Sequence, residues 1–224
     1  MSKLSEEITV KFAKARKGYQ KIKVKLGFYG PMYLISYTIR QRRYRILIDA
    51  FFTDITNFKP LRVLLAKNIS ALGVQLINEK ELEIPLIKPL ASVQKILSDL
   101  QDIIYEAGVT YYRKEEAISV IQEELDEFLP ELIRFIEEGM AGKEHIIRSA
   151  FLGLLMKEGL GLAFRSIEEF KVEKTMLVYY PILIDENNRA YEIAWKLTSS
   201  EIYTYLFSSK TLFEKISEYT SSSS

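Results

Sequence analysis

The segment 32–52, MYLISYTIRQRRYRILIDAFF, carries the strongest constraint on folding, because apolar and polar residues alternate along most of it. Alternation with a period of two is typical of a β-strand with one buried face. A loop centred on Gln41–Arg42 predicts a hairpin whose apolar face pairs Ile39 with Tyr44, Tyr37 with Ile46, and Ile35 with Ile48. On the opposite face, Arg40 is expected beside Arg43, and Thr38 beside Arg45. The segment therefore predicts a hairpin with one apolar face and one basic face.

Two further segments have the alternation of strands. Residues 21–25 alternate lysines with apolar residues and end near Gly27, Gly30 and Pro31, which predict a turn. Residues 175–197 predict a second hairpin with Asn187–Asn188 at its turn, because Asn tolerates a left-handed backbone. Its expected pairs are Ile184 with Tyr191, Ile182 with Ile193, and Tyr180 with Trp195.

The remaining apolar residues recur mainly at helical spacing. The ranges expected to be helical are 4–17, 58–72, 91–106, 115–138, 144–157 and one or two short helices in 199–219. Gly73 is expected to end the second of these helices, and the glycines at 159 and 161 to end the helix at 144–157. Each hairpin has only one apolar face and needs a second layer to cover it.

The predicted fold class is therefore α+β. An N-terminal strand (21–25) and the two hairpins form an antiparallel sheet, and a central helical region covers one face of it. We divide the chain into a basic β-rich region with one helix (1–90), an acidic helical region (91–173), a second hairpin with C-terminal helices (174–219) and a disordered tail (220–224). Residues 1–219 are expected to form one domain, with a split near residue 90 as the alternative.

Charge is unevenly distributed along the chain. Residues 1–46 contain twelve Lys and Arg and two acids, a net charge of +10, whereas residues 77–140 contain fifteen acids and six bases, a net charge of −9. The whole chain has a net charge of +1. A dense basic segment can bind a polyanion by neutralising phosphates and releasing their counterions.

These charges predict a non-catalytic protein that binds DNA or RNA through its N-terminal sheet, within an oligomer or larger complex. Lys and Arg would contact phosphates, while the nearby aromatic residues Tyr19, Phe28, Tyr29, Tyr33 and Tyr44 include rings that could stack on bases. The expected nucleic-acid-binding residues are Lys21, Lys23, Lys25, Arg40, Arg42, Arg43 and Arg45.

Two other functions fit the same sequence. In the first, the protein is a structural or adaptor subunit whose basic and acidic faces associate between copies or with a protein partner. In the second, it is a metal-dependent nuclease, which needs clustered carboxylates and a positioning lysine. Asp49 and Asp54 are its candidate carboxylates, but no acid-x-Lys signature accompanies them, because Ala50 and Phe51 follow Asp49.

No cofactor, resident metal or catalytic group is predicted. His145 is the only histidine and cysteine is absent, so a zinc site built from several His or Cys ligands is excluded. The glycines in 157–165 do not form a nucleotide-binding motif. Without cysteines, an apparent signal sequence or a long apolar run, the chain is expected to be intracellular and cytoplasmic, without membrane contact. Few Gln and Asn and many Lys and Glu fit a thermophilic source.

Overall fold

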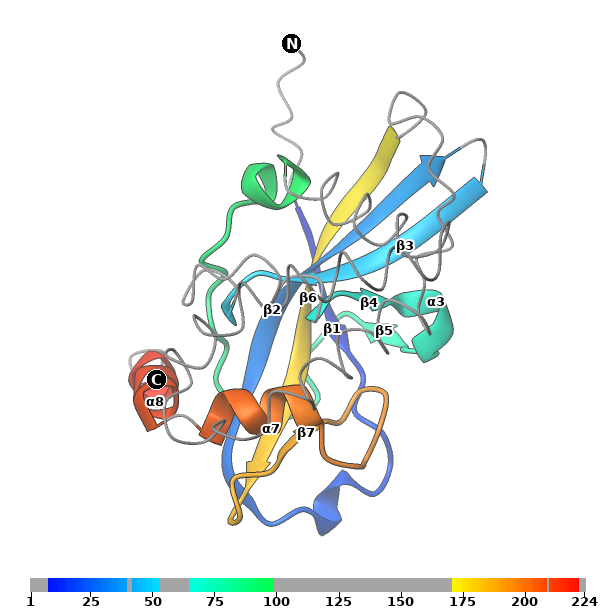
Figure 1. Ribbon diagram of the computed structural model, residues 1–224. Coiled ribbons are helices and arrows are strands. Elements are labelled where there is room, and N and C mark those ends of the chain that lie inside the picture. The colour runs from blue at the N-terminus through cyan, green and yellow to red at the C-terminus, as the bar shows by residue number, and fades with distance from the viewer. Residues whose placement is uncertain (1–7, 40–41, 53–64, 99–170, 209, 222–224) are drawn as a thin grey trace, which may run out of the picture.

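The computed structural model describes residues 8–39, 42–52, 65–98, 171–208 and 210–221, and its centre is a mixed β-sheet (Figure 1). The strands lie in the order β4-β3-β2-β6-β1-β5, and β7 pairs with β6. The elements are β1 (Thr9–Ala13), η1 (Tyr19–Lys21), β2 (Val24–Ile39), β3 (Arg42–Asp49), β4 (Lys67–Asn68), α3 (Ile69–Leu72), β5 (Leu76–Ile77), β6 (Lys171–Asp185), β7 (Ala190–Glu192), α7 (Glu201–Ser208) and α8 (Lys210–Ser221).

Strand β1 corrects two predictions. Residues 9–13 were expected in a helix, but they form a strand that lies parallel to β6 and antiparallel to β5. The sheet is therefore mixed, not antiparallel. Tertiary packing overrides the weak helical pattern, since Phe12 stacks on Tyr179 with ring centroids 5.6 Å apart and meets Tyr29 edge-on at 5.5 Å.

Strand β2 passes through the turn that was expected at residues 27–31. It pairs with β6 along nearly its whole length, so the strand expected at 21–25 is not a separate neighbour of the hairpin. The backbone N–H and C=O of Tyr29 point away from β6. The N–H donates instead to the carbonyl of Pro85, at 2.8 Å. Pro31, two residues on, has the same orientation, so its missing N–H removes no bond from the β2–β6 ladder.

The first hairpin forms with a register two residues from the predicted one. Tyr37 pairs with Tyr44, Ile35 with Ile46, and Thr38 with Arg43. Because side chains alternate with a period of two, a shift of two residues preserves the predicted faces. Arg40 and Gln41 lie outside the described residues.

The predicted register of the second hairpin is wrong by one residue, since Leu183 pairs with Tyr191 and Ile182 with Glu192. The reason lies in the turn, where Asp185 accepts hydrogen bonds from the backbone N–H groups of Asn187 and Arg189, both at 2.9 Å. Asn188 takes the left-handed conformation, with φ of 59°, as expected. This loop has three residues between Asp185 and Arg189, which places Glu192 opposite Ile182.

The described helices are few and short. Residues 67–68, expected in a helix, form β4, while α3 ends as predicted at Gly73, whose φ is +61°. Of the helix expected at 91–106, residues 93–98 are helical. The predicted helices at 115–138 and 144–157 lie outside the described residues, as does most of the acidic region. Helices α7 and α8 confirm the C-terminal prediction, and α8 extends through Thr220 and Ser221 of the expected tail.

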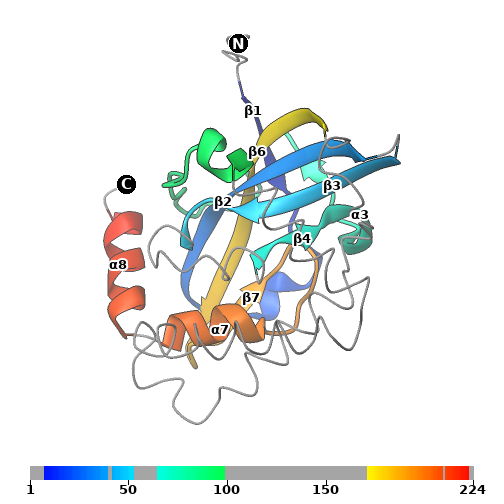
Figure 2. The same ribbon diagram turned by 45° about the horizontal axis from the view of Figure 1, so that its top comes forward.

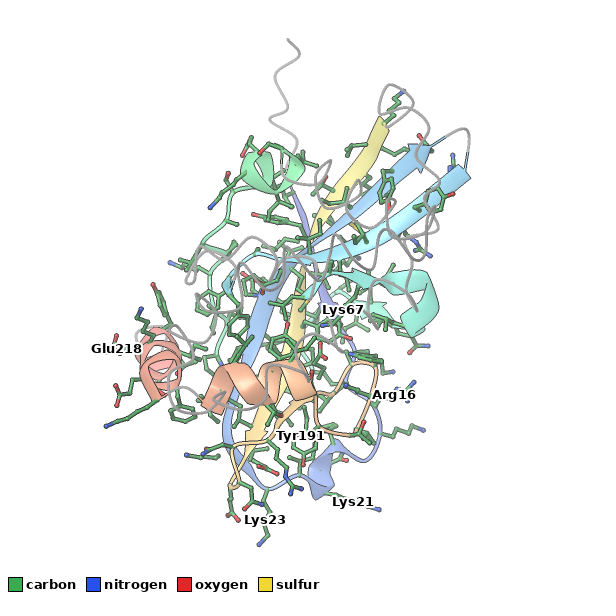
Figure 3. All side chains as sticks on the ribbon, in the orientation of Figure 1. Arg16, Lys21, Lys23, Lys67, Tyr191 and Glu218 are labelled. Atoms are coloured by element: carbon green, nitrogen blue, oxygen red, sulfur yellow. The ribbon has the colours of Figure 1, made fainter. Side chains whose placement is uncertain are left out.

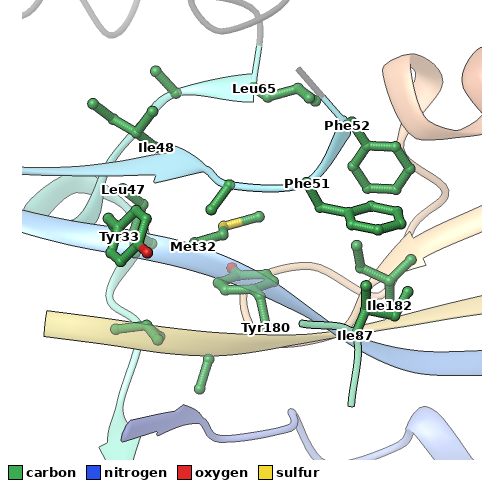
Figure 4. Close-up of a cluster of buried hydrophobic side chains, with 14 of the residues drawn as sticks. Met32, Tyr33, Leu47, Ile48, Phe51, Phe52, Leu65, Ile87, Tyr180 and Ile182 are labelled. Atoms are coloured by element: carbon green, nitrogen blue, oxygen red, sulfur yellow. The ribbon is translucent and has the colours of Figure 1, made fainter. Parts of the chain in front are cut away.

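The core occupies both faces of the sheet. Every residue from Gly27 to Ile35 of β2 is buried, so the centre of the sheet has no basic face, contrary to the prediction. On one face, Phe51 and Phe52 lie over Met32, Tyr180 and Ile182 (Figure 4). Helix α7 covers the lower part of the same region (Figure 2). Its Phe207 packs against both Phe28 and Phe52, with ring centroids under 6 Å apart.

Close packing at Gly27 leads to a prediction about stability. An added Cβ there would lie 2.9 Å from Leu183 Cδ2 and 3.2 Å from Ile84 Cγ2. We expect Gly27→Ala to lower the free energy of unfolding by about 1–3 kcal/mol, as overpacking does. The matched control is Gly30→Ala, whose Cβ meets its nearest atom at 3.4 Å. Urea denaturation measures both, and equal stabilities would contradict the packing at Gly27.

The buried tyrosines predict a loss of stability in alkali. Burial raises the pKa of several phenols above the ordinary value, namely Tyr29, Tyr33, Tyr37, Tyr179, Tyr191 and Tyr203. Above about pH 10 the unfolded chain releases these protons while the folded protein retains them, so stability falls as pH rises. Urea denaturation at several pH values between about 9 and 11 measures this fall in the free energy of unfolding. Unchanged stability, with all phenols ionising near pH 10, would contradict the burial.

Candidate functional site

Six cations gather on one loop at the end of the sheet. This basic loop, residues 14–25, joins β1 to β2 and includes η1 and the start of β2. Its exposed cations are Lys14, Arg16, Lys17, Lys21, Lys23 and Lys25. Figure 3 shows Arg16, Lys21 and Lys23 at the lower end of the molecule, beside Tyr191. Three of the predicted binding residues, Lys21, Lys23 and Lys25, thus lie together, and the structure adds three more.

The basic loop is held in place by the backbone and a small apolar cluster. Ala15 donates its N–H to Glu81 Oε2 at 2.9 Å, and Arg16 donates its N–H to the carbonyl of Ile193 at 2.8 Å. Ala15 also packs with Leu183 and Ile193 in a buried cluster. Because these contacts use the backbone and an alanine side chain, the charged side chains remain directed to solvent.

The electrostatics of the basic loop are one-sided. No acid occurs between residues 14 and 25. Within the described ranges, none of the six cations forms an ion pair, and the one carboxylate that reaches the loop, from Glu81, accepts a backbone N–H. Lys25 donates to Asn188 Oδ1 at 2.9 Å and lies 4.6 Å from the centre of the Phe213 ring. The positive charge is therefore available to an external anion.

The predicted arginines lie at the other end of the sheet. Lys25 and Ser36, the partner of Arg45, are eleven residues apart on β2, which is about 36 Å of strand. Arg43 and Arg45 are both exposed, and Arg43 forms an ion pair with Glu173 at 3.5 Å. Arg40 and the side chain of Arg42 lie outside the described residues. The sequence thus suggested one basic face, whereas the structure has two separated groups of cations.

A second polar site, which sequence reasoning missed, is buried in the core. Lys67 of β4 donates to Glu192 Oε1 of β7, and both side chains are almost fully buried. The Lys67 ammonium also lies over the rings of Tyr203 and Tyr180, 5.0 Å and 5.8 Å from their centres. Asp49, at the end of β3, is 2% exposed and accepts the backbone N–H of Phe51.

We call Lys67, Glu192 and Tyr203 the buried charged cluster, because Lys67 contacts the other two. Strand β7 is the fourth neighbour of β4 across the sheet, after β3, β2 and β6. In a flat sheet the axes of β4 and β7 would be about 19 Å apart. Contact between Lys67 and Glu192 therefore requires a strongly curved sheet, and β2 has the register irregularities that promote curvature. The sequence signal for this site was weak, because Lys67 lay inside an apparent helix and is separated from Glu192 by 125 residues.

The remaining sequence candidates gain little from the structure. Asp54 and His145 lie outside the described residues. Among the described residues, no three His, Asp or Glu side chains are grouped as metal ligands. The described helices include none with the length and apolarity needed to cross a membrane.

Comparison with protein-family models, with curated proteins and with solved structures finds no match to this chain. The functional argument therefore depends on the geometry and charge of the chain itself.

Proposed function

We propose that the protein binds nucleic acid through the phosphate backbone, using the basic loop as its main contact surface. The observation that carries this proposal is the set of six exposed cations, none of them in an ion pair among the described residues, within twelve residues of a loop that its backbone holds in place. A preformed array of cations gains free energy by releasing the counterions condensed on a polyanion. The Arg43–Glu173 pair makes the other end of the sheet a weaker candidate.

The proposed contact is with phosphates and not with bases. Of the aromatic residues expected to stack on bases, Phe28, Tyr29 and Tyr33 are buried in the core. Tyr19 is half-buried against the cluster beneath the basic loop. Phosphate contacts position a protein on nucleic acid without reading its sequence, so we expect binding that depends little on base composition.

Fluorescence anisotropy with labelled duplex DNA, single-stranded DNA and RNA tests the proposal. We expect log K to fall steeply with log[salt] between about 50 and 200 mM, with a slope of about 0.9 for each phosphate contacted in duplex DNA. Two duplexes of equal length and different sequence should bind with similar affinity. Absence of binding at low salt would overturn the proposal and favour the adaptor function, in which protein carboxylates neutralise the same cations.

A further inference from the structure

At the end opposite the basic loop, the sheet narrows to a three-stranded arm (Figure 1). Strand β4 pairs with β3 only at Ile46 and Leu47, and β1 pairs with β6 only from Met176 onward. Past these pairs, the ends of β2, β3 and β6 have no fourth strand beside them among the described residues. We call these three strand ends the arm, which comprises residues 36–39, 42–45 and 171–175. We propose that one face of the arm is a second contact surface for the phosphate backbone of a duplex, an inference that rests on the function proposed above.

Four exposed cations lie on a single face of the arm. These arm cations are Arg43, Arg45, Lys171 and Lys174. On the central strand, Ser36 pairs with one of them on each side, and Thr38 pairs with the other two. Residues that are paired directly across a sheet point to the same face. Two rows of cations therefore flank a central row of short side chains.

A β-bulge in β6 brings the two lysines of the arm to this face. Lys171 and Lys174 are three residues apart, and in a regular strand they would point to opposite faces. The β2–β6 register shifts by one residue between Ser36 and Tyr37, which restores a common face. The opposite face carries Tyr37, which stacks on Tyr44 with ring centroids 5.6 Å apart. The arm therefore has one basic face and one aromatic face.

The basic face of the arm keeps most of its charge. Arg43 forms an ion pair with Glu173 at 3.5 Å, and Glu173 is the only acid in the three ranges of the arm. Within the described part of the chain, the other three arm cations form no ion pair. An array of such cations gains free energy by releasing the counterions of a polyanion.

Helices α7 and α8 relate the basic loop to the basic face of the arm. Phe28 and Ser36 share a face of β2, because β2 pairs with β6 in a regular register between them. Helix α7 covers this face, since its Phe207 packs against Phe28. The Lys25 ammonium lies 4.6 Å from the ring centre of Phe213 in α8, which packs against α7. Lys25 thus lies beside the helices that cover the same face of β2 as the arm cations.

The spacing of the two groups of cations favours a duplex as their shared partner. Lys25 and Ser36 are separated by eleven residues of β2, about 36 Å of strand. One turn of duplex DNA has about the same length, roughly 34–36 Å. A duplex lying along β2 therefore presents the same strand of its backbone near both ends. A much shorter duplex reaches only one of them.

The test is fluorescence anisotropy with two labelled DNA hairpins, whose stems have about 6 and about 20 base pairs. The short stem is roughly 20 Å long and cannot reach from the basic loop to the arm, whereas the long stem can. We expect Arg45→Gln, Lys174→Gln to lower the affinity for the long stem by about tenfold at roughly 100 mM salt. For the short stem, the same variant should lose less than about twofold, because only the basic loop contacts it.

A matched control removes the same charge from other exposed positions. Lys88→Gln, Lys215→Gln changes two cations that lie outside both the arm and the basic loop. This variant should bind each stem within about twofold of the wild type. Circular dichroism checks that both variants fold.

The proposal is overturned if the arm variant binds the long stem as tightly as the wild type, or if it loses the same factor with both stems. Either outcome leaves the function proposed above standing, whereas a wild-type protein that binds neither stem overturns both. Light scattering without DNA addresses the other class of partner. A change in the mass of the arm variant there would make the arm a contact between protein copies and would also overturn the proposal.

Discussion

Replacing Arg16, Lys17, Lys21 and Lys23 together by Gln should lower the affinity for duplex DNA by about 100-fold or more at roughly 100 mM salt. These four side chains are exposed, and no described contact ties them to the core. If each contacts one phosphate, the slope of log K against log[salt] should become shallower by about 0.9 for each cation removed. Anisotropy titrations at several salt concentrations measure both quantities, and circular dichroism checks that the variant folds.

A matched control comes from the other end of the sheet. Replacing Arg43, Arg45, Lys171 and Lys174 by Gln removes the same charge from exposed positions far from the basic loop. If the loop is the main contact surface, this variant should lose less affinity and less salt slope than the loop variant. Equal losses would show that net charge, not the arrangement of the loop, drives binding. A larger loss in the control would move the interface to the hairpin.

The second large effect concerns stability. Lys67→Met should lower the free energy of unfolding by about 3–5 kcal/mol, because it leaves the buried carboxylate of Glu192 without its partner. Both side chains of the pair are nearly inaccessible to water, with 6% and 3% of their surfaces exposed. Urea denaturation gives the change in free energy. A loss below about 1 kcal/mol, typical of exposed pairs, would contradict this burial.

Two controls isolate the charge effect. The double variant Lys67→Met, Glu192→Met removes both charges at similar volume and should recover most of the lost stability. Arg43→Met breaks the exposed pair with Glu173, where the arginine side chain is 82% exposed, and should change stability by less than about 1 kcal/mol. If the double variant is as unstable as the single one, lost packing and not an unpaired charge is responsible.

Local patterns predicted some parts of the fold well. The first hairpin was predicted from the alternation of its residues. Its register was wrong by two residues, but the predicted faces are correct because side chains alternate with a period of two. The second hairpin was also predicted, but its register was wrong by one residue. Each residue of β6 therefore lies opposite a residue of β7 that had been assigned to the other face. The cause was the Asp185 turn, whose side-chain hydrogen bonds set the loop length. Turn geometry of this kind depends on contacts that a hydrophobic pattern does not encode.

The candidate sites also include features that the sequence predicted and features that only the fold revealed. The cations of the basic loop are adjacent in the sequence, and an acid-free basic segment was visible before the fold was known. Their separation from Arg43 and Arg45 was not visible, because β2 continues through Gly27, Gly30 and Pro31 as one long strand. Pairing with β6, which lies far along the chain, supplies the backbone bonds that keep β2 extended.

The sequence by itself determined the alternating faces of the strands, the end of α3 at Gly73 and the positive charge of residues 14–25, since each depends on neighbouring residues. Tertiary structure alone decided that residues 9–13 form a strand and that Lys67 meets Glu192, 125 residues away. A buried lysine has a low free energy only beside its carboxylate. That carboxylate reaches it because the sheet curves, and curvature is a property of the assembled strands.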